Sequence, residues 1–355
     1  MRILLLSRYA DLGASSRVRY LQYLPYLEHQ GMYFTVVPLF SNRYLKALYE
    51  GNRAWLEIFK GYFRRVLSLL RARQFDVLII EKELFPFLPA IAERILHWAG
   101  VPYLVDYDDA IFHNYDHNSN WWIRTLLGRK IDKVMQLSNA VMVGNQYLAQ
   151  RAHSAGAKRV EIVSTVVDSE RYFPRIKCNR DVPLIVGWIG TPKTSHYLKP
   201  LLPTFEHLQS RYRVRFVAVG ANEKDFVNTP IEAWAWSEAS EIPSIQQFDI
   251  GIMPLLDSPW ERGKCGYKLI QYMACGLPVV ASPIGVNSEI VLVGENGFLA
   301  NTASEWVDTL SRLLSNTALR QKMGKAGRKR VVEKYCIQQV VPRLAALLRT
   351  VWEGH

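Results

Sequence analysis

The feature that most constrains the fold is an alternation of short apolar runs with longer amphipathic stretches along all 355 residues. The runs are rich in Val, Ile and Leu without strict alternation, which is typical of parallel strands buried on both faces. They form two sets: 3–7, 34–39, 77–81, 103–107, 140–145 and 161–165, then 184–189, 215–220, 233–236, 250–254, 278–282 and 297–300. Helix-length stretches between them indicate βαβ units, so we predict an α/β protein with two doubly wound sheets.

The polar, proline-bearing stretch 168–183 predicts a linker between two domains, since 355 residues exceed one typical core. We expect domains at 1–170 and 171–335, with a C-terminal helix over 336–355 that packs back toward the first domain. In doubly wound folds, ligands bind beyond the carboxyl ends of the strands, so the loops after the strands are the places to look for a site.

The composition favours an anionic partner. The net charge is +12 and the pI is near 9.5, which suits a phosphate-bearing ligand, nucleic acid or an anionic lipid surface. No nucleic-acid module is recognisable, so we expect no nucleic-acid partner. No apolar run reaches the roughly 18 residues of a membrane span, and the first ten residues resemble a buried strand more than a signal peptide. The cysteines form no CxxC pair and are predicted to be reduced thiols: Cys178, Cys265, Cys275 and Cys336.

Three loops of the first half carry candidate residues. After the first strand, Gly13 precedes a helix start at which Ser15 or Ser16 either caps the helix or, with Arg17, contacts a ligand. After the third strand, Glu83 is either a solvated carboxylate or a substrate contact.

After the fourth strand stand three aspartates, Asp106, Asp108 and Asp109, which repel one another unless they bind something. Asp106 and Asp108 form a D-x-D pair for magnesium or manganese, or the carboxylates accept hydrogen bonds from sugar hydroxyls, or Asp109 caps the next helix. His113 and His117 have i, i+4 spacing, but we do not favour a metal site there.

The second half carries glycine turns with cations, which suit phosphate. The first turn holds Gly190, Thr191 and Lys193, and Trp236 with Ser237 ends a later strand, where Trp236 either packs in the core or stacks on a nucleobase. Arg262 and Lys264 precede a helix, and a further turn holds Gly285, Val286 and Asn287. Together the turns predict a diphosphate site that needs no divalent metal, with Gln271 placed to bond a ribose hydroxyl.

The stretch "YMACGLPVVASPIGVNSEIV…ENGFL" is similar to "EAMACGTPVVAS…G…EIV…NGFL" of the GT4 family, glycosyl transferases group 1, and the resemblance covers almost the whole chain. It implies the GT-B fold, two Rossmann-like domains facing a central cleft, with the first domain binding the acceptor and the second the nucleotide sugar. It implies sugar transfer from a nucleotide diphosphate sugar to a hydroxyl acceptor with retention of configuration and no cofactor. We expect a role in cell-envelope or exopolysaccharide synthesis, in the cytoplasm or at the inner face of the membrane.

The family's donor motif, two glutamates separated by seven residues, falls on Gly263 and Gln271. Gln271 retains a carbonyl that can accept from ribose, whereas Gly263 cannot contact the sugar. The resemblance assigns leaving-group stabilisation to Lys193 and Lys264, and it places Asp108 where the family often has a histidine. Two rivals remain: a metal-dependent GT-A transferase using Asp106 and Asp108, and a non-catalytic nucleotide-sugar-binding protein.

Residues 43–73 combine eight Arg or Lys with six aromatic residues and two Glu. This pattern predicts either a solvated basic helix pair packed on the first domain or a surface that touches an anionic membrane. A lipid-linked or cell-envelope glycan acceptor would account for the second alternative.

Overall fold

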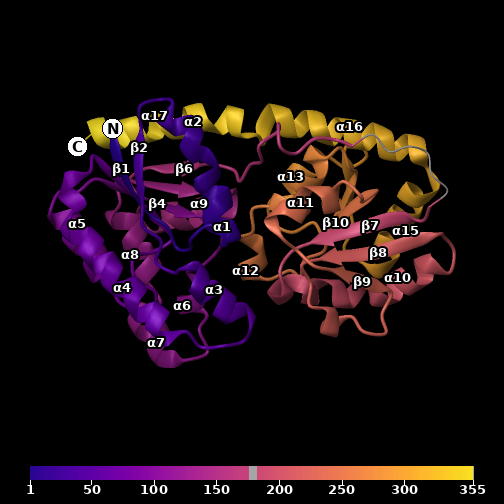
Figure 1. The fold of residues 1–355 in the computed structure, drawn as a ribbon, viewed down its shortest axis with the longest axis horizontal. Coiled ribbons are helices and arrows are strands. Elements are labelled where there is room, and N and C mark those ends of the chain that lie inside the picture. The colour runs from indigo at the N-terminus through magenta and orange to yellow at the C-terminus, as the bar shows by residue number, and fades with distance from the viewer. Residues whose placement is uncertain (176–181, 355) are drawn as a thin grey trace. The chain divides into compact units, whose positions relative to one another are not determined.

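The computed structural model describes residues 1–175 and 182–354. These residues form two compact units, which we call the N-terminal unit (Met1–Thr165, Arg262–Cys265 and Ile337–His355) and the C-terminal unit (Val166–Glu261 and Gly266–Cys336). Each unit holds one six-stranded sheet with helices packed on it (Figure 1). Cys178 and part of the predicted linker lie outside the described residues.

The sheet of the N-terminal unit is parallel throughout, in the order β2-β1-β3-β4-β5-β6. Its strands are β1 (Arg2–Leu6), β2 (Tyr33–Val36), β3 (Val77–Glu81), β4 (Tyr103–Tyr107), β5 (Ala140–Val143) and β6 (Val160–Ile162). Its helices are α1 (Ala14–Arg19), α2 (Leu24–Glu28), α3 (Asn42–Tyr49), α4 (Trp55–Leu70), α5 (Ile91–Trp98), α6 (His113–Asp116), α7 (Trp121–Leu127), α8 (Lys130–Leu137), α9 (Gln146–Ser154) and α17 (Ile337–Glu353), with the 3-10 turns η1 (Leu21–Tyr23) and η2 (Ala72–Gln74). The C-terminal helix α17 packs on α2 and β3.

The sheet of the C-terminal unit is also parallel, in the order β12-β11-β10-β7-β8-β9. Its strands are β7 (Leu184–Ile189), β8 (Val214–Val219), β9 (Ile231–Trp234), β10 (Ile250–Met253), β11 (Val279–Ala281) and β12 (Gly297–Leu299). Its helices are η3 (Pro192–Leu201), α10 (Leu202–Gln209), η4 (Glu223–Asp225), α11 (Glu238–Ile245), α12 (Pro259–Arg262), α13 (Tyr267–Ala274), α14 (Asn287–Ile290), α15 (Ala303–Ser315) and α16 (Thr317–Lys334).

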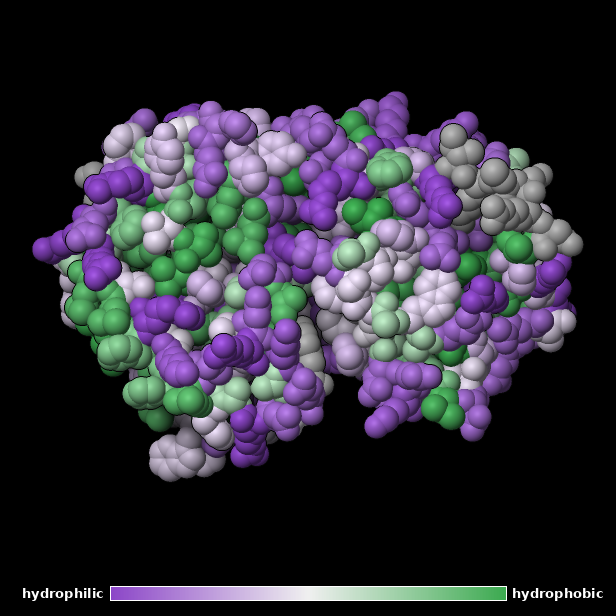
Figure 2. Space-filling view, viewed as in Figure 1, coloured by the Kyte–Doolittle hydropathy of each residue, from purple (hydrophilic) through white to green (hydrophobic). Residues whose placement is uncertain are grey.

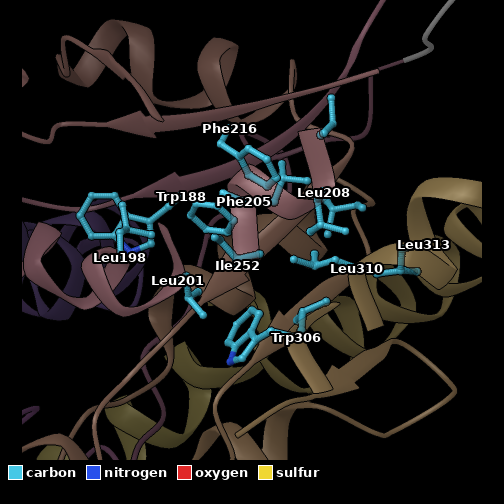
Figure 3. Packing of buried hydrophobic residues seen from close by; sticks show 14 of the residues in the cluster. Trp188, Leu198, Leu201, Phe205, Leu208, Phe216, Ile252, Trp306, Leu310 and Leu313 are labelled. Carbon is cyan, nitrogen blue, oxygen red and sulfur yellow. The ribbon is translucent and has the colours of Figure 1, made fainter. Parts of the chain in front are cut away.

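A large apolar cluster holds the C-terminal unit together (Figure 3). Trp188 of β7 and Phe216 of β8 meet Phe205 of α10, and the rings of Phe205 and Phe216 stack at 4.1 Å. Trp306 and Leu310 of α15 join the same cluster. Since burial of each such side chain contributes about 1.5–3 kcal/mol, this core fixes the sheet whose carboxyl edge carries the candidate loops.

All twelve predicted strands are present, and the prediction of two doubly wound parallel sheets is confirmed. Several strands end earlier than predicted, and at β5 the reason is a helix cap. Asn145 was assigned to a strand, but its side chain accepts from the amide of Leu148 and caps α9.

The strand orders place a topological switch point in each sheet, between β1 and β3 in the N-terminal unit and between β7 and β10 in the C-terminal unit. Ligands of doubly wound proteins bind at such points. None of the described helices is long and apolar enough to cross a membrane.

Candidate functional site

A buried carboxylate, Glu81, stands at the switch point of the N-terminal unit. The hydroxyls of Ser15 and Ser16 lie 2.8 and 2.6 Å from its oxygens, and the amide of Arg8 donates to it at 2.7 Å. Glu81 is 1% exposed, and burial raises the pKa of its carboxyl, with Lys82 opposing. The loop after β1 and the end of β3 are therefore joined through one side chain.

Ser15 also bonds Asp108, since its Oγ lies 2.8 Å from Asp108 Oδ2. A hydroxyl has one proton, so it can donate to only one of the two carboxyl groups and must accept from the other. Burial alone would raise the pKa of Asp108, but Lys82 and Arg19 outweigh it and lower that pKa to about 2. Asp108 is therefore the more readily ionised of the two carboxyl groups that share the Ser15 hydroxyl.

Lys82 supplies the counter-charge. Its Nζ lies 2.9 Å from Asp108 and 3.5 Å from Asp109, and its side chain is 7% exposed. Its backbone has a φ of 69°, a left-handed conformation that costs a side-chain-bearing residue free energy. Burial raises the pKa of Asp109, and the neighbouring Asp108 adds to the increase, so the two aspartates differ in how readily they take up a proton.

Asp106, the other half of the D-x-D pair, is not available to a metal. Its carboxylate accepts hydrogen bonds from Nε and Nη2 of Arg19 and, at 2.8 Å, from the hydroxyl of Tyr20. The side chains of Arg19 and Asp106 are each 1% exposed. Nη1 of Arg19 donates to the carbonyl of Val163 at 2.7 Å. The D-x-D metal hypothesis is therefore wrong for Asp106, which serves as the buried partner of an arginine.

Glu83 is not a solvated carboxylate. It is 4% exposed, and its oxygens lie 2.5 Å from Lys130 Nζ, 3.3 Å from Arg8 Nη1 and 2.7 Å from the hydroxyl of Tyr115. Neither Lys130 nor Tyr115 was singled out from the sequence.

The capping alternative for Ser15 and Ser16 is also wrong, since Gly13 is the N-cap of α1 and both hydroxyls bond carboxyl groups instead. Gly13 is required by close packing, because a Cβ there would lie 2.2 Å from Cβ of Tyr9. Arg17 bonds the carbonyl of Asp11 at 3.4 Å.

The segment Arg262–Cys265 packs within the N-terminal unit. The side-chain nitrogen of Asn145 donates to the carbonyls of Gly263 and Lys264 at 2.9 and 3.0 Å. A Cβ on Gly263 would lie 2.5 Å from Cβ of Ala110, so no side chain fits at the position where the family has its first glutamate. Burial and Asp108 act to raise the pKa of Asp109, whereas Lys264 favours its ionised form.

His113, Asp116 and His117 bring one ligand atom each within 4.8 Å of one another. Both ring nitrogens of His113 already have partners, Asp116 at 2.8 Å and Tyr147 at 2.9 Å. Arg151 also pairs with Asp116 at 3.0 Å, and a cation beside the carboxylate disfavours a metal ion.

In the C-terminal unit, the loop after β7 holds Gly190 and Thr191. A Cβ on Gly190 would lie 2.3 Å from the Trp188 ring, so the chain reaches η3 only with glycine there. Thr191 caps η3 through a reciprocal arrangement with Thr194, and Lys193 is exposed in the first turn of that helix.

Glu241 of α11 organises the other predicted residues of this unit. Its Oε1 accepts from Gln271 Nε2 at 3.1 Å and from the hydroxyl of Tyr172, and its Oε2 accepts from Trp236 Nε1 at 2.9 Å. Gln271 also donates to the Tyr172 hydroxyl at 3.0 Å. Both Gln271 bonds use its nitrogen, so a contact with ribose would rest on the carbonyl oxygen.

Three other residues predicted to contact the donor stabilise a helix start or a turn of this unit. The hydroxyl of Ser237 caps α11, accepting from the amide of Ser240 at 3.1 Å. Asn287 is 1% exposed and donates to the carbonyl of Ser282 at 3.1 Å, which holds the turn containing Gly285 and Val286. Gly285 has a φ of 53°, the left-handed conformation that this turn requires.

Replacing Gln271 by leucine is expected to lower the free energy of unfolding by about 1–3 kcal/mol, because it removes a buried donor from the carboxylate of Glu241. Gln271→Glu places two carboxyl groups together and should destabilise the unit further near neutral pH. Urea unfolding without ligand measures both effects.

Calorimetric titration of the variants with a nucleoside diphosphate separates the two roles of Gln271. A dissociation constant that Gln271→Leu raises about tenfold supports the ribose contact, and an unchanged constant leaves Gln271 a structural residue only.

A sequence profile described as Glycosyl transferases group 1 matches residues 183–316. The sulfoquinovosyl transferase SQD2 of Arabidopsis thaliana is 27% identical over 61% of this chain and 44% of its own length, and spore coat protein SA of Bacillus subtilis is 23% identical over 61% of this chain and 65% of its own length. The chain thus matches about half the length of these relatives.

Two solved structures match over essentially the whole chain. Sucrose-phosphate synthase from Thermosynechococcus elongatus has a TM-score of 0.75 at 13% identity and covers 100% of both chains. HepE of Anabaena in complex with UDP has a TM-score of 0.69 at 16% identity and covers 99% of this chain and 100% of its own. The likeness extends across both sheets.

Proposed function

The chain belongs to glycosyl transferases group 1, the GT4 family of glycosyltransferases (EC class 2.4), and has the GT-B fold, and from this we propose that it transfers a sugar from a nucleotide diphosphate sugar to a hydroxyl acceptor with retention of configuration. The GT-A rival fails because that architecture does not contain a second doubly wound sheet.

The observation that carries the proposal is the group of residues at the carboxyl edge of the C-terminal sheet. The profile match includes the loop with Gly190 and Lys193, the Trp236–Glu241–Gln271 network and the turn at Gly285. The flat indole of Trp236 suits the base of a nucleotide, and the amide carbonyl of Gln271 suits its ribose. The helix start that carries Lys193 suits its diphosphate. HepE binds UDP and UDP-glucose, so we propose a UDP-sugar as the first donor to test.

In the proposed reaction the bond between the anomeric carbon and the diphosphate oxygen breaks while the acceptor hydroxyl attacks on the same face. Negative charge grows on the departing diphosphate, and preorganised cations stabilise it, each contributing roughly 2.7–4 kcal/mol. We assign this role to Lys193 and Lys264.

The ionised Asp108, held by Lys82 and Ser15, suits the acceptor side, because a carboxylate accepts hydrogen bonds from sugar hydroxyls. We place Gly13, Arg17, Glu83 and Asp109 around it as the framework of the acceptor site. A protein named for capsular polysaccharide biosynthesis in Staphylococcus aureus is 21% identical over 51% of this chain, and we propose a cell-envelope or exopolysaccharide acceptor.

The test incubates the purified chain with UDP-glucose and other nucleotide sugars in EDTA and measures release of the nucleoside diphosphate. We expect turnover without added metal, and NMR of the product should show the anomeric configuration of the donor. If a nucleotide sugar binds but no nucleoside diphosphate is released with any cell extract added as a source of acceptor, the result would instead favour the non-catalytic binding protein. Activity that EDTA abolishes and manganese restores would contradict the metal-free mechanism.

A further inference from the structure

Helix α4 turns its apolar side chains outward. Trp55, Phe59, Phe63, Val66 and Leu70 recur every three or four residues, which places them on one face, and they are 67%, 70%, 58%, 46% and 78% exposed. The residues that α4 buries are Gly61 and Arg65. An amphipathic helix on a soluble surface normally has the opposite arrangement.

Helix α5 continues the same surface. Ile91, Ile95 and Trp98 are 59%, 56% and 78% exposed at i, i+4 and i+7. Hydrogen bonds place α5 beside α4: the hydroxyl of Tyr62 donates to the carbonyl of Pro86 just before α5, and Arg73 just after α4 donates to the carbonyl of Ala99. The two apolar stripes therefore belong to one area of the N-terminal unit.

Helix α7 borders this area. Trp121 and Trp122 are exposed and their rings stack at 3.9 Å, and Leu126 is 74% exposed. A cavity of about 460 Å³ lies between α5 and α7 and is lined by residues that include Arg94, Leu126 and Lys133. We call the outward side of α4, α5 and α7 the apolar face, and Figure 2 shows hydrophobic surface where Figure 1 labels α4 and α5.

Cations predominate among the exposed charges around the apolar face. Between residues 51 and 100, every exposed charged side chain is a cation: Arg53, Lys60, Arg64, Arg71, Arg73 and Arg94. The carboxylates of the same segment are half-buried or buried. A second copy docked on this face would bring like charges together, whereas an anionic lipid surface complements both the apolar side chains and the cations.

We propose that the apolar face of α4, α5 and α7 binds an anionic lipid bilayer, with the aromatic and aliphatic side chains entering the headgroup region and the surrounding cations contacting lipid phosphates. This goes beyond sugar transfer and is independent of it. It also extends the sequence-based hypothesis for residues 43–73 to two helices that lay outside that segment.

The test is sedimentation of the full chain with vesicles of phosphatidylcholine alone or with phosphatidylglycerol. We expect binding to the anionic vesicles that weakens with salt. Lys60→Glu with Arg94→Glu should lower the partition coefficient by at least about thirtyfold, because the loss of two cations at about 1 kcal/mol each already corresponds to that factor and the new carboxylates add repulsion. Phe59→Ser with Phe63→Ser should lower it at least tenfold.

Matched controls make the same kind of substitution outside the apolar face. Lys325→Glu with Lys329→Glu reverses two exposed cations of the basic helix α16, and Phe173→Ser with Val227→Ser removes two exposed apolar side chains of the C-terminal unit. Both controls should bind as the parent does, and circular dichroism should show all variants folded.

Three results would overturn the proposal. One is equal binding to neutral and anionic vesicles by parent and variants, and another is a control that weakens binding as much as the matched change on the apolar face. The third is a parent protein that does not bind vesicles and is a dimer in sedimentation velocity, whereas Phe59→Ser with Phe63→Ser is a monomer. That result would make the apolar face an interface between copies of the chain.

Discussion

Asp106→Ala is expected to lower the free energy of unfolding by about 3–5 kcal/mol, because it leaves the guanidinium of Arg19 buried without its counter-charge. The variant also removes the acceptor of the Tyr20 hydroxyl, so a second buried donor loses its partner. Chemical unfolding in urea, followed by tryptophan fluorescence and circular dichroism, measures the difference.

The matched control is Glu232→Ala, which breaks an ion pair of the same chemistry at the surface. Arg215 donates to Glu232 at 2.8 and 2.5 Å, but the two side chains are 40% and 43% exposed. That variant should cost under about 1 kcal/mol. A stable Asp106→Ala protein that has lost a manganese-dependent activity of the parent would show instead that Asp106 is a metal ligand.

Lys193→Ala and Lys264→Ala should each lower kcat by about two orders of magnitude if these cations stabilise the leaving diphosphate as proposed, which corresponds to about 2.7 kcal/mol of transition-state stabilisation. The loss should appear in kcat more than in KM, since the charge on the diphosphate grows during bond breaking. Steady-state assays of nucleoside diphosphate release give both constants.

Lys199→Ala, in the same helix η3 as Lys193, and Lys158→Ala, in the N-terminal unit, control for loss of an exposed positive charge. Both should keep the parent's turnover. Near-parental kcat in Lys193→Ala or Lys264→Ala would remove that lysine from the mechanism, and the donor loops would then act through backbone amides alone.

The strands were predictable because parallel strands buried on both faces leave a local signal of Val, Ile and Leu. The loops of the site were predictable for a related reason, since the fold places ligands at strand ends. Partnerships across the sequence were not predictable. Ser15 looks like a helix cap in its own context, and only the pairing of β1 with β3 brings it to Glu81, 66 residues away.

In the C-terminal unit, too, contacts between residues far apart in the sequence were not predictable. Tyr172 lies in a stretch whose prolines and charges predicted a linker, yet it is 5% exposed and bonds Gln271 and Glu241. Glu241 follows a helix cap in the sequence, which gives no reason to expect that it joins Trp236 to Gln271. Its role depends on α11 and α13 packing in one unit.

The outward orientation of the apolar side chains of α4 also affects how readily this helix opens locally. Inside the unit, Arg65 donates to the carbonyl of Ser7, while among the described residues its Nε and Nη1 have no hydrogen-bond partner. Burial of apolar area is the main source of helix stability in folded proteins. It contributes little to α4, because the residues that this helix buries are Gly61 and Arg65. The amide hydrogens of α4 should therefore exchange with solvent through local opening well before those of α13, whose apolar residues are buried.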